Sequence, residues 1–151
     1  ASSIAREKGI QIVETKVDES SHYTNMLVLR ISSDGHKAEV RGTVFPSDQF
    51  LIFGVDEFDL DMPLEGNFLL TKHHDMPGMI GKIGTLLGKR DINIARMGVG
   101  RADKGGNALM LIAVDQDVGK AVVAEFRALP NFHEARSIVL SHMKPREYMN
   151  I

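Results

Sequence analysis

The sequence contains no cysteine. That absence excludes disulfides, thiolate nucleophiles, zinc fingers and cysteine-ligated iron–sulfur clusters, and it suits the reducing cytoplasm, where we expect the protein to act. An excess of one charge is also missing, because 18 basic and 20 acidic residues leave a net charge of -2. With no basic stripe to neutralise phosphates, we expect no nucleic-acid partner.

Long apolar runs are absent as well. No run approaches the roughly 20 residues of a membrane-spanning helix, and the first residues lack the apolar core of a signal peptide, so we expect no membrane partner. The 151 residues are 43% hydrophobic and 25% charged, as in a packed globular protein. Such a length holds one ordinary domain or two small ones. The chain begins with Ala1 and not Met, and we expect it to be cut from something longer.

The first half is predicted to be rich in strands. Ala1 to Lys8 has the pattern of a helix end, with Gly9 as its stop. Asp34-Gly35 is a strong hairpin signal between two apolar runs. The expected strands are 10–17, 26–31, 38–45, 50–54 and 57–60. We therefore predict a small strand-rich domain over residues 1–64.

The second half changes rhythm. Two segments carry apolar residues at helical spacing, 79–87 and 118–129. Strands are expected at 67–73, 92–100, 108–114 and 132–140. The order βαββαβ is that of a ferredoxin-like fold. The predicted fold class is therefore α+β, with a second domain at 65–141 and a tail at 142–151 that shows no pattern.

Three motifs that resemble catalytic or cofactor sites fail on their context. The lysine in 81–84 is followed by neither Ser nor Thr, and the segment lies inside a helix, so it is not a phosphate loop. Segment 98–100 lies in a strand and lacks the third glycine of a dinucleotide fingerprint. His73 and His74 are adjacent in a strand and point to opposite faces, which argues against a shared metal ion. We predict no catalytic residue, no metal and no nicotinamide cofactor in this chain.

The turn before the first of these two helices is the most informative feature. Asp75 can cap that helix, Pro77 suits its first turn, and Gly78 lets a ligand approach the backbone. Free N–H groups at a helix start can receive a carboxylate, and Asp75 and Asn93 can accept from an ammonium group. One interpretation is a site for a zwitterion. The other is an ordinary helix cap and turn, and the spacing leaves both open.

Residues in and after this turn follow one known pattern. They are His73-x-Asp75-x-Pro77-Gly78-x-x-Gly81-Lys82-Ile83-Gly84-Thr85-Leu86-Leu87-Gly88, Ile92-Asn93-Ile94, Met97-x-Val99-Gly100-Arg101 and Lys104-Gly105-Gly106-x-Ala108-Leu109-Met110. This pattern resembles an ACT domain, and more narrowly the C-terminal ACT domain of the D-3-phosphoglycerate dehydrogenase family. Segments 5–10 and 42–44 resemble that family's linker and its intervening allosteric-substrate-binding domain. The resemblance covers about residues 1–140.

The resemblance implies a function in feedback regulation. The family's effector is L-serine, which binds where two ACT domains meet side by side and inhibits an NAD-dependent enzyme of serine biosynthesis. The residues implied to contact serine are His73, Asp75 and Asn93 through side chains, and Pro77, Gly78 and Met79 through the backbone. The implied partners are L-serine and further copies of the chain, as a dimer or tetramer. NAD belongs to the parent enzyme and not to this part.

Two other assignments stay open. Iron–sulfur L-serine dehydratase chains pair similar domains in the same order, and free-standing ACT proteins bind amino acids. The match of residues 5–10 to the dehydrogenase linker favours the first assignment, and a start without Met disfavours a free-standing protein.

The resemblance also carries a departure and two expectations. Some relatives bind anions through basic residues where this chain has Gln49 and Asp61, which argues against such an anion site here. Lys37 and Arg41 are expected to be solvated. The helix glycines at 81, 84 and 88 each cost about 0.8–1.0 kcal/mol relative to Ala. We expect close packing of a backbone or a ligand against them to compensate.

Overall fold

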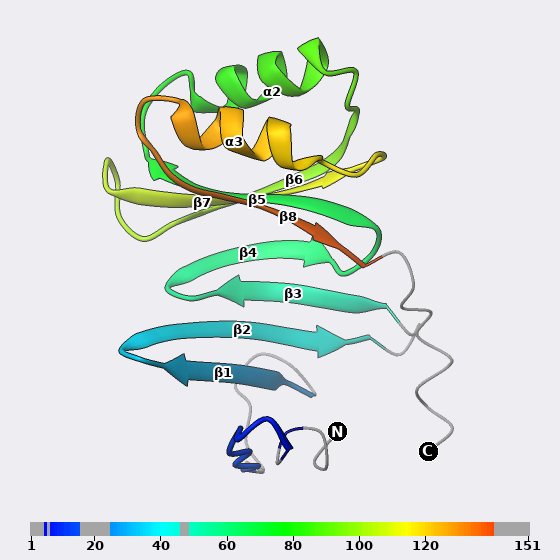
Figure 1. Ribbon diagram of the computed structural model, residues 1–151, viewed down its shortest axis with the longest axis vertical. Coiled ribbons are helices and arrows are strands. Elements are labelled where there is room, and N and C mark those ends of the chain that lie inside the picture. Colours follow the sequence, from blue (N-terminus) through cyan, green and yellow to red (C-terminus); the bar gives the residue numbers. More distant parts are fainter. Residues whose placement is uncertain (1–4, 6, 16–24, 46–48, 141–151) are drawn as a thin grey trace.

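The computed structural model of this protein describes residues 5, 7–15, 25–45 and 49–140. Its elements are β1 (Leu27–Ser33), β2 (His36–Val44), β3 (Phe50–Val55), β4 (Phe58–Pro63), β5 (Asn67–His74), α2 (Met79–Lys89), β6 (Ile94–Arg101), β7 (Asn107–Val114), α3 (Lys120–Ala128) and β8 (Phe132–Val139). The strands form two four-stranded antiparallel sheets, and both helices cover one face of the second sheet (Figure 1). The predicted α+β class and the βαββαβ order are confirmed.

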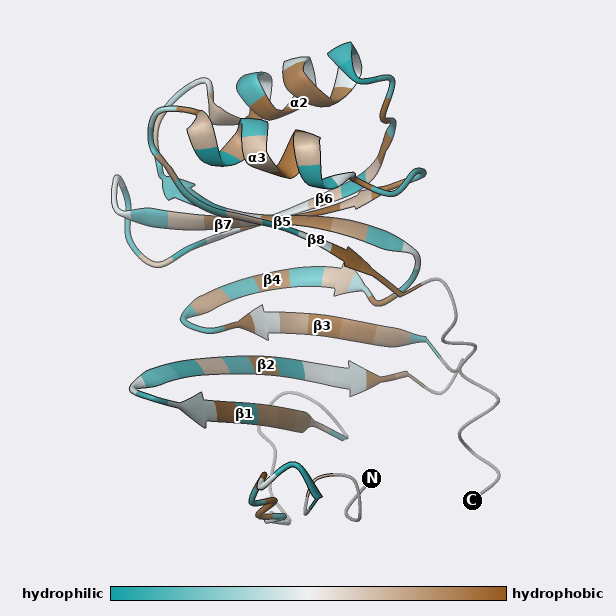
Figure 2. Cartoon of the chain, in the orientation of Figure 1, coloured by the Kyte–Doolittle hydropathy of each residue, from teal (hydrophilic) through white to brown (hydrophobic). Residues whose placement is uncertain are grey.

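The first sheet is a meander with the strand order β1-β2-β3-β4. Its first turn is the predicted hairpin, with φ angles of 47° at Asp34 and 81° at Gly35. Positive φ at both central residues is the requirement of a type I′ turn. The edge strand β1 is apolar along much of its length (Figure 2), and it leaves Leu27, Leu29 and Ile31 exposed.

The N-terminal segment ends a helix as predicted. Ala5 is helical, Gly9 has a φ of 68°, and the N–H of Ile10 donates to the carbonyl of Ala5 at 2.8 Å. A glycine with positive φ and a hydrogen bond reaching back over the last turn are the ordinary way for a helix to stop.

The strand predicted at 10–17 is wrong over residues 10–15, which form no strand. Ile12 and Val13 are 58% and 77% exposed there. Among the described residues no strand pairs with this segment, and β-branched residues do not form a strand without a partner. Residues 16–17 and the predicted tail at 142–151 lie outside the described residues.

The second sheet has the strand order β6-β7-β5-β8 and is apolar on both faces. Successive residues of β5 point to opposite faces, so Leu69 packs toward the helices and Leu70 toward β4. The helix-side core includes Ile83 and Leu87 of α2 and Phe126 of α3. The opposite core is made by Phe58, Leu60 and Met62 of β4 against Phe68, Leu70, Leu109 and Leu111.

Two glycines let β4 approach the edge strand β6. A Cβ at Gly100 would lie 2.6 Å from the carbonyl oxygen of Asp59, which is backbone and has little freedom to move. A Cβ at Gly98 would lie 3.3 Å from Cε of Met62, the far end of a flexible side chain. The contact between the two sheets therefore depends on Gly100 more than on Gly98.

The glycines of α2 have a different environment. A Cβ at Gly81, Gly84 or Gly88 would meet no atom within 4 Å among the described residues outside the helix's own backbone, because these positions face away from Ile83 and Leu87, which α2 buries in the core. The expectation that a neighbouring backbone packs closely against them is therefore wrong within this chain. The face that they form is open.

We predict that Gly100→Ala destabilises the protein while Gly98→Ala has a smaller effect. The first substitution forces a shift of the β4 backbone, and overpacking of this kind typically costs about 1–3 kcal/mol. The second displaces the methyl end of Met62. Urea unfolding of the two variants and the wild type measures the difference, and equal stability of Gly100→Ala and wild type would contradict the packing described here.

Candidate functional site

The turn from β5 to α2 exposes the start of a helix. Gly78 is the N-cap, with a φ of 90°, and among the described residues no side chain caps the helix. The prediction that Asp75 caps α2 is wrong, because the capping residue directly precedes the helix and Asp75 lies three positions earlier. The first-turn N–H groups have no intrahelical partner and are left without a capping side chain.

Asp75 instead ties this turn to the β6–β7 hairpin. Its Oδ2 accepts from the N–H of Gly105 at 3.3 Å and lies 3.3 Å from Nε of Arg101. Its own N–H donates to the carbonyl of Gly106 at 2.8 Å. The Asp75 side chain is 19% exposed, so its carboxylate is held in a fixed place at the surface.

Arg101 is a site residue that sequence reasoning missed. Arg101 belongs to the sequence pattern that resembles an ACT domain, but that pattern did not show which residues lie beside it. Its position in one row with His73 follows from strand register. Arg101 pairs with Ala108, and Ala108 pairs with His73. Residues directly opposite each other share a sheet face, so Arg101, Ala108 and His73 form one row across three strands, with the small side chain of Ala108 in the middle.

His73 is buried at the end of that row. It is 1% exposed, and its ring lies 5.6 Å from the ring of Phe132. Burial lowers the pKa of His73 below its usual 6.5, which the carboxylate of Asp75 opposes and His133 reinforces. Among the described residues its Nδ1 has no hydrogen-bond partner, and such an orphaned polar atom calls for an explanation.

Asn93 lies at the other end of the sheet. It precedes β6, whose first residue Ile94 pairs with Val114, and Val114 pairs with Asn67. The residues from Asn67 to His74 span about 23 Å at the usual rise of a strand. The Nδ2 of Asn93 donates to Oδ2 of Asp115 at 2.7 Å. One copy of the chain therefore brings His73, Asp75 and the α2 start together, but not Asn93.

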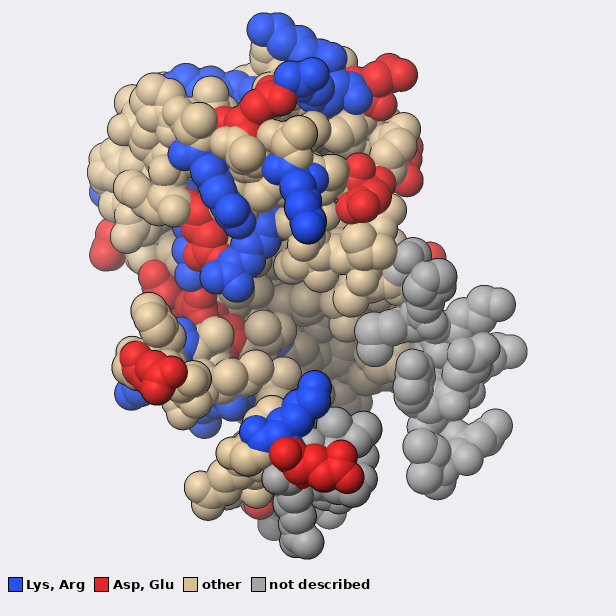
Figure 3. All heavy atoms as spheres, viewed as in Figure 1, with Lys and Arg blue, Asp and Glu red and all other residues tan. Residues whose placement is uncertain are grey.

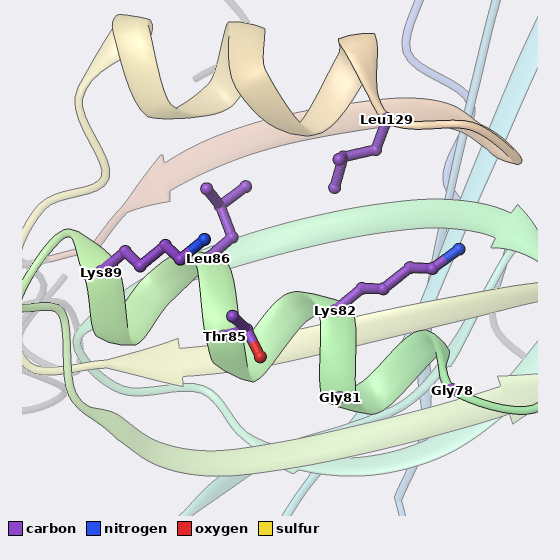
Figure 4. A pocket seen from close by; sticks show the side chains of 7 residues that line it. All are labelled: Gly78, Gly81, Lys82, Thr85, Leu86, Lys89 and Leu129. Carbon is purple, nitrogen blue, oxygen red and sulfur yellow. The ribbon is translucent and has the colours of Figure 1, made fainter.

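Two hollows lie away from this row. A groove of about 450 Å³ runs along α2 toward Leu129, where Leu86 and Leu129 point into the space between the helices (Figure 4). Its further lining residues are Gly78, Gly81, Lys82, Thr85 and Lys89. A cleft of about 980 Å³ lies where the two sheets meet, beside Phe45, Gln49, Asn67 and Arg96. Of the residues implied to bind serine, Gly78 alone borders either hollow.

Charges of both signs are mixed on one face of the molecule. On the face that Figure 3 shows, basic side chains lie among acidic ones. His74 is exposed while His73 is buried, and the described residues hold no group of three or more potential metal ligands. No helix among them is long and apolar enough to cross a membrane.

The first sheet, β1-β2-β3-β4, corrects one expectation. Arg41 is not solvated: its side chain is 25% exposed, lies 3.0 Å from a carboxylate oxygen of Asp59 and stacks 6.0 Å from the ring of Phe53. Glu39 lies next to it on the same face at 3.5 Å. Glu39 is two residues from Arg41 on the same strand, whereas Asp59 reaches Arg41 through register, because Arg41 pairs with Gly54 and Gly54 pairs with Asp59. Lys37 is exposed, as expected.

Comparison with known proteins divides the chain in two. The ACT domain family matches residues 68–131, and the D-3-phosphoglycerate dehydrogenase intervening domain matches residues 1–56. A curated relative from Archaeoglobus fulgidus named D-3-phosphoglycerate dehydrogenase is 37% identical over 142 residues, 93% of this chain and 27% of the relative. Relatives of the same name from Synechocystis and Bacillus subtilis are 34% and 32% identical, over 90% and 93% of this chain and 24% and 27% of theirs. The chain thus spans about a quarter of the length of these relatives.

The fold and these matches define a regulatory segment in which a strand-rich intervening domain precedes an ACT domain. The chain belongs to the D-3-phosphoglycerate dehydrogenase family and corresponds to its C-terminal regulatory part.

We predict that protonation of His73 destabilises the fold. Because its folded pKa lies below 6.5, the unfolded chain binds a proton between the two pKa values and the folded chain does not. The free energy of unfolding therefore decreases as the pH falls below 6.5, by at most about 1.4 kcal/mol per pH unit. Urea unfolding between pH 7.5 and 5.5 should show a weaker pH dependence for His73→Phe. The exposed neighbour supplies the control, since His74→Gln should keep the wild-type dependence.

Proposed function

We propose that this chain binds L-serine between the ACT domains of two copies and transmits feedback inhibition to an NAD-dependent dehydrogenase. The observation that carries the proposal is the position of Asp75 and Asn93 at opposite ends of an edge strand. Asn93 precedes the first residue of β6, and Arg101, the partner of Asp75, is its last residue. A second copy is needed to unite the two ends.

The edge of the sheet supplies a way to do so. β6 is an outer strand, and an outer strand presents unpaired backbone groups that favour pairing with another chain. If two β6 strands pair antiparallel about a two-fold axis, the start of one lies beside the end of the other. Asn93 of the second copy then lies beside the Asp75 turn of the first, and the symmetry makes two equal sites.

The open face of α2 supports the same pairing. Gly81, Gly84 and Gly88 cost helix stability, and among the described residues outside α2 nothing packs closely against them. Ile80, beside them, is 57% exposed. A second copy seated on this face would give the close backbone approach that the glycines permit.

The chemistry of the turn suits an α-amino acid. The uncapped N–H groups at the start of α2 offer donors to a carboxylate. They begin directly after Pro77, where Gly78 is the N-cap and Met79 is the first residue of the helix. Asp75 offers an acceptor to the ammonium group, and Asn93 of the other copy offers a second. The orphaned Nδ1 of buried His73 is a further polar atom beneath the site.

The parent protein remains part of the proposal. The relatives described above all carry the name D-3-phosphoglycerate dehydrogenase, which favours that parent, with NAD bound outside this segment, over a serine dehydratase or a free-standing ACT protein. The domain limits at 1–64 and 65–141 are proposed as well, and the family matches at residues 1–56 and 68–131 support them.

We predict that L-serine raises the melting temperature of this chain and that Asn93→Ala abolishes the effect. Ligand at one hundred times Kd adds about 2.7 kcal/mol to stability, which shifts Tm by several degrees, since about 1 kcal/mol corresponds to roughly 2–8 °C. Thermal melting over a serine series measures it. D-Serine and glycine should shift Tm less, and the exposed amide variant Gln11→Ala should behave as wild type. No shift of the wild-type Tm at tens of millimolar serine would reject the proposal.

We predict that the chain is at least a dimer at micromolar concentration and that Ile80→Glu weakens it. A charge on the open α2 face would have to be desolvated in the interface. Val139, 50% exposed at the opposite edge of the sheet, provides the control, because Val139→Glu should leave association unchanged. Sedimentation equilibrium decides, and a wild type of 16.7 kDa would overturn the pairing.

A further inference from the structure

Arg101 and Asp75 form an ion pair in which each side chain keeps atoms that make no hydrogen bond within the described residues. The Nε of Arg101 lies 3.3 Å from Oδ2 of Asp75. Among the described residues, no hydrogen bond reaches Oδ1 of Asp75 or the terminal nitrogens of Arg101. The Arg101 side chain is 60% exposed and that of Asp75 is 19% exposed. One acceptor and one planar donor group thus stand side by side and open to solvent.

The pair is held in place by backbone contacts on both sides. The hairpin donates the N–H of Gly105 to Asp75, and Gly106 accepts from the Asp75 N–H. Arg101 is the last residue of β6, fixed by its pairing with Ala108. These contacts remain if the guanidinium is removed, so the charge of Arg101 can be changed without releasing Asp75.

The Arg101–Asp75 pair presents one charge of each sign at this place. His73, in the row beneath, is neutral near pH 7 because burial lowers its pKa. A ligand with a single positive charge would be attracted by Asp75 and repelled by Arg101, whereas a zwitterion has a charge of opposite sign for each of the two.

We propose that Arg101 sets the charge specificity of this site, admitting α-amino-acid zwitterions and rejecting amines that lack a carboxylate. The role rests on the proposed function, since it concerns the same turn. It assigns to Arg101 a part in recognition that the residues implied by resemblance do not include. The positive charge of Arg101 attracts the same carboxylate that the N–H groups of α2 are proposed to receive, and Asp75 offers its free oxygen to the ammonium group.

The test compares L-serine with ethanolamine, which keeps the ammonium and hydroxyl groups of serine and lacks the carboxylate. Isothermal titration calorimetry on the whole chain gives the ratio of the two Kd values. We expect Arg101→Gln to lower the preference for serine by about tenfold, or about 1.4 kcal/mol. Arg101→Lys retains the charge and should keep the ratio within about threefold of wild type.

Arg136 provides the matched control. It is 67% exposed and ion-paired with Glu134 on β8, at the opposite edge of the sheet. Arg136→Gln makes the same change in net charge and should leave the ratio unchanged.

Each outcome separates the two proposals. A wild type that binds serine, with an unchanged ratio in Arg101→Gln, overturns the role of Arg101 alone. An equal change in Arg136→Gln assigns the effect to net charge and also overturns it. Equal loss of both ligands in Arg101→Gln, without rescue by lysine, indicates a structural role and overturns charge selection. A wild type that does not bind serine overturns the proposed function itself.

Discussion

The sheet of the ACT domain is apolar on both faces, and the rest of the structure follows from covering them. The helices α2 and α3 shield one face, and β4 of the intervening sheet shields the other. An exposed apolar sheet face invites association, so the two domains are packed as one unit. Gly100 makes this possible, because a side chain there would collide with the backbone of β4.

Covering the faces leaves the outer strands uncovered at their edges. β6 is one such strand, and both ends of it carry polar residues proposed for ligand binding. The separation between Asp75 and Asn93 is therefore a consequence of the length and direction of β6. If the ligand binds across two chains as proposed, its binding and the pairing of the chains depend on each other, which is the thermodynamic requirement for regulation through assembly.

Local patterns predicted the elements well where the deciding interaction is local. Asp34-Gly35 requires only its own backbone geometry, and the helix end at Gly9 requires one turn. Prediction failed where a distant partner decides. Residues 10–15 have strand propensity but pair with no strand among the described residues, and Asp59 meets Arg41 only through the register of β2, β3 and β4. The prediction that Asp75 caps α2 was wrong for a local reason. The N-cap is Gly78, three residues after Asp75.

The sequence by itself determined the class of the fold and the order of its helices and strands in the second domain, because periodicity and family resemblance both lie along the chain. Only the tertiary structure decided what Asp75 contacts. Antiparallel register placed Arg101 and His73 on either side of Ala108, and the hairpin brought Gly105 to the same carboxylate. Register depends on which strands become neighbours and how they align, and the packing of the whole sheet settles both.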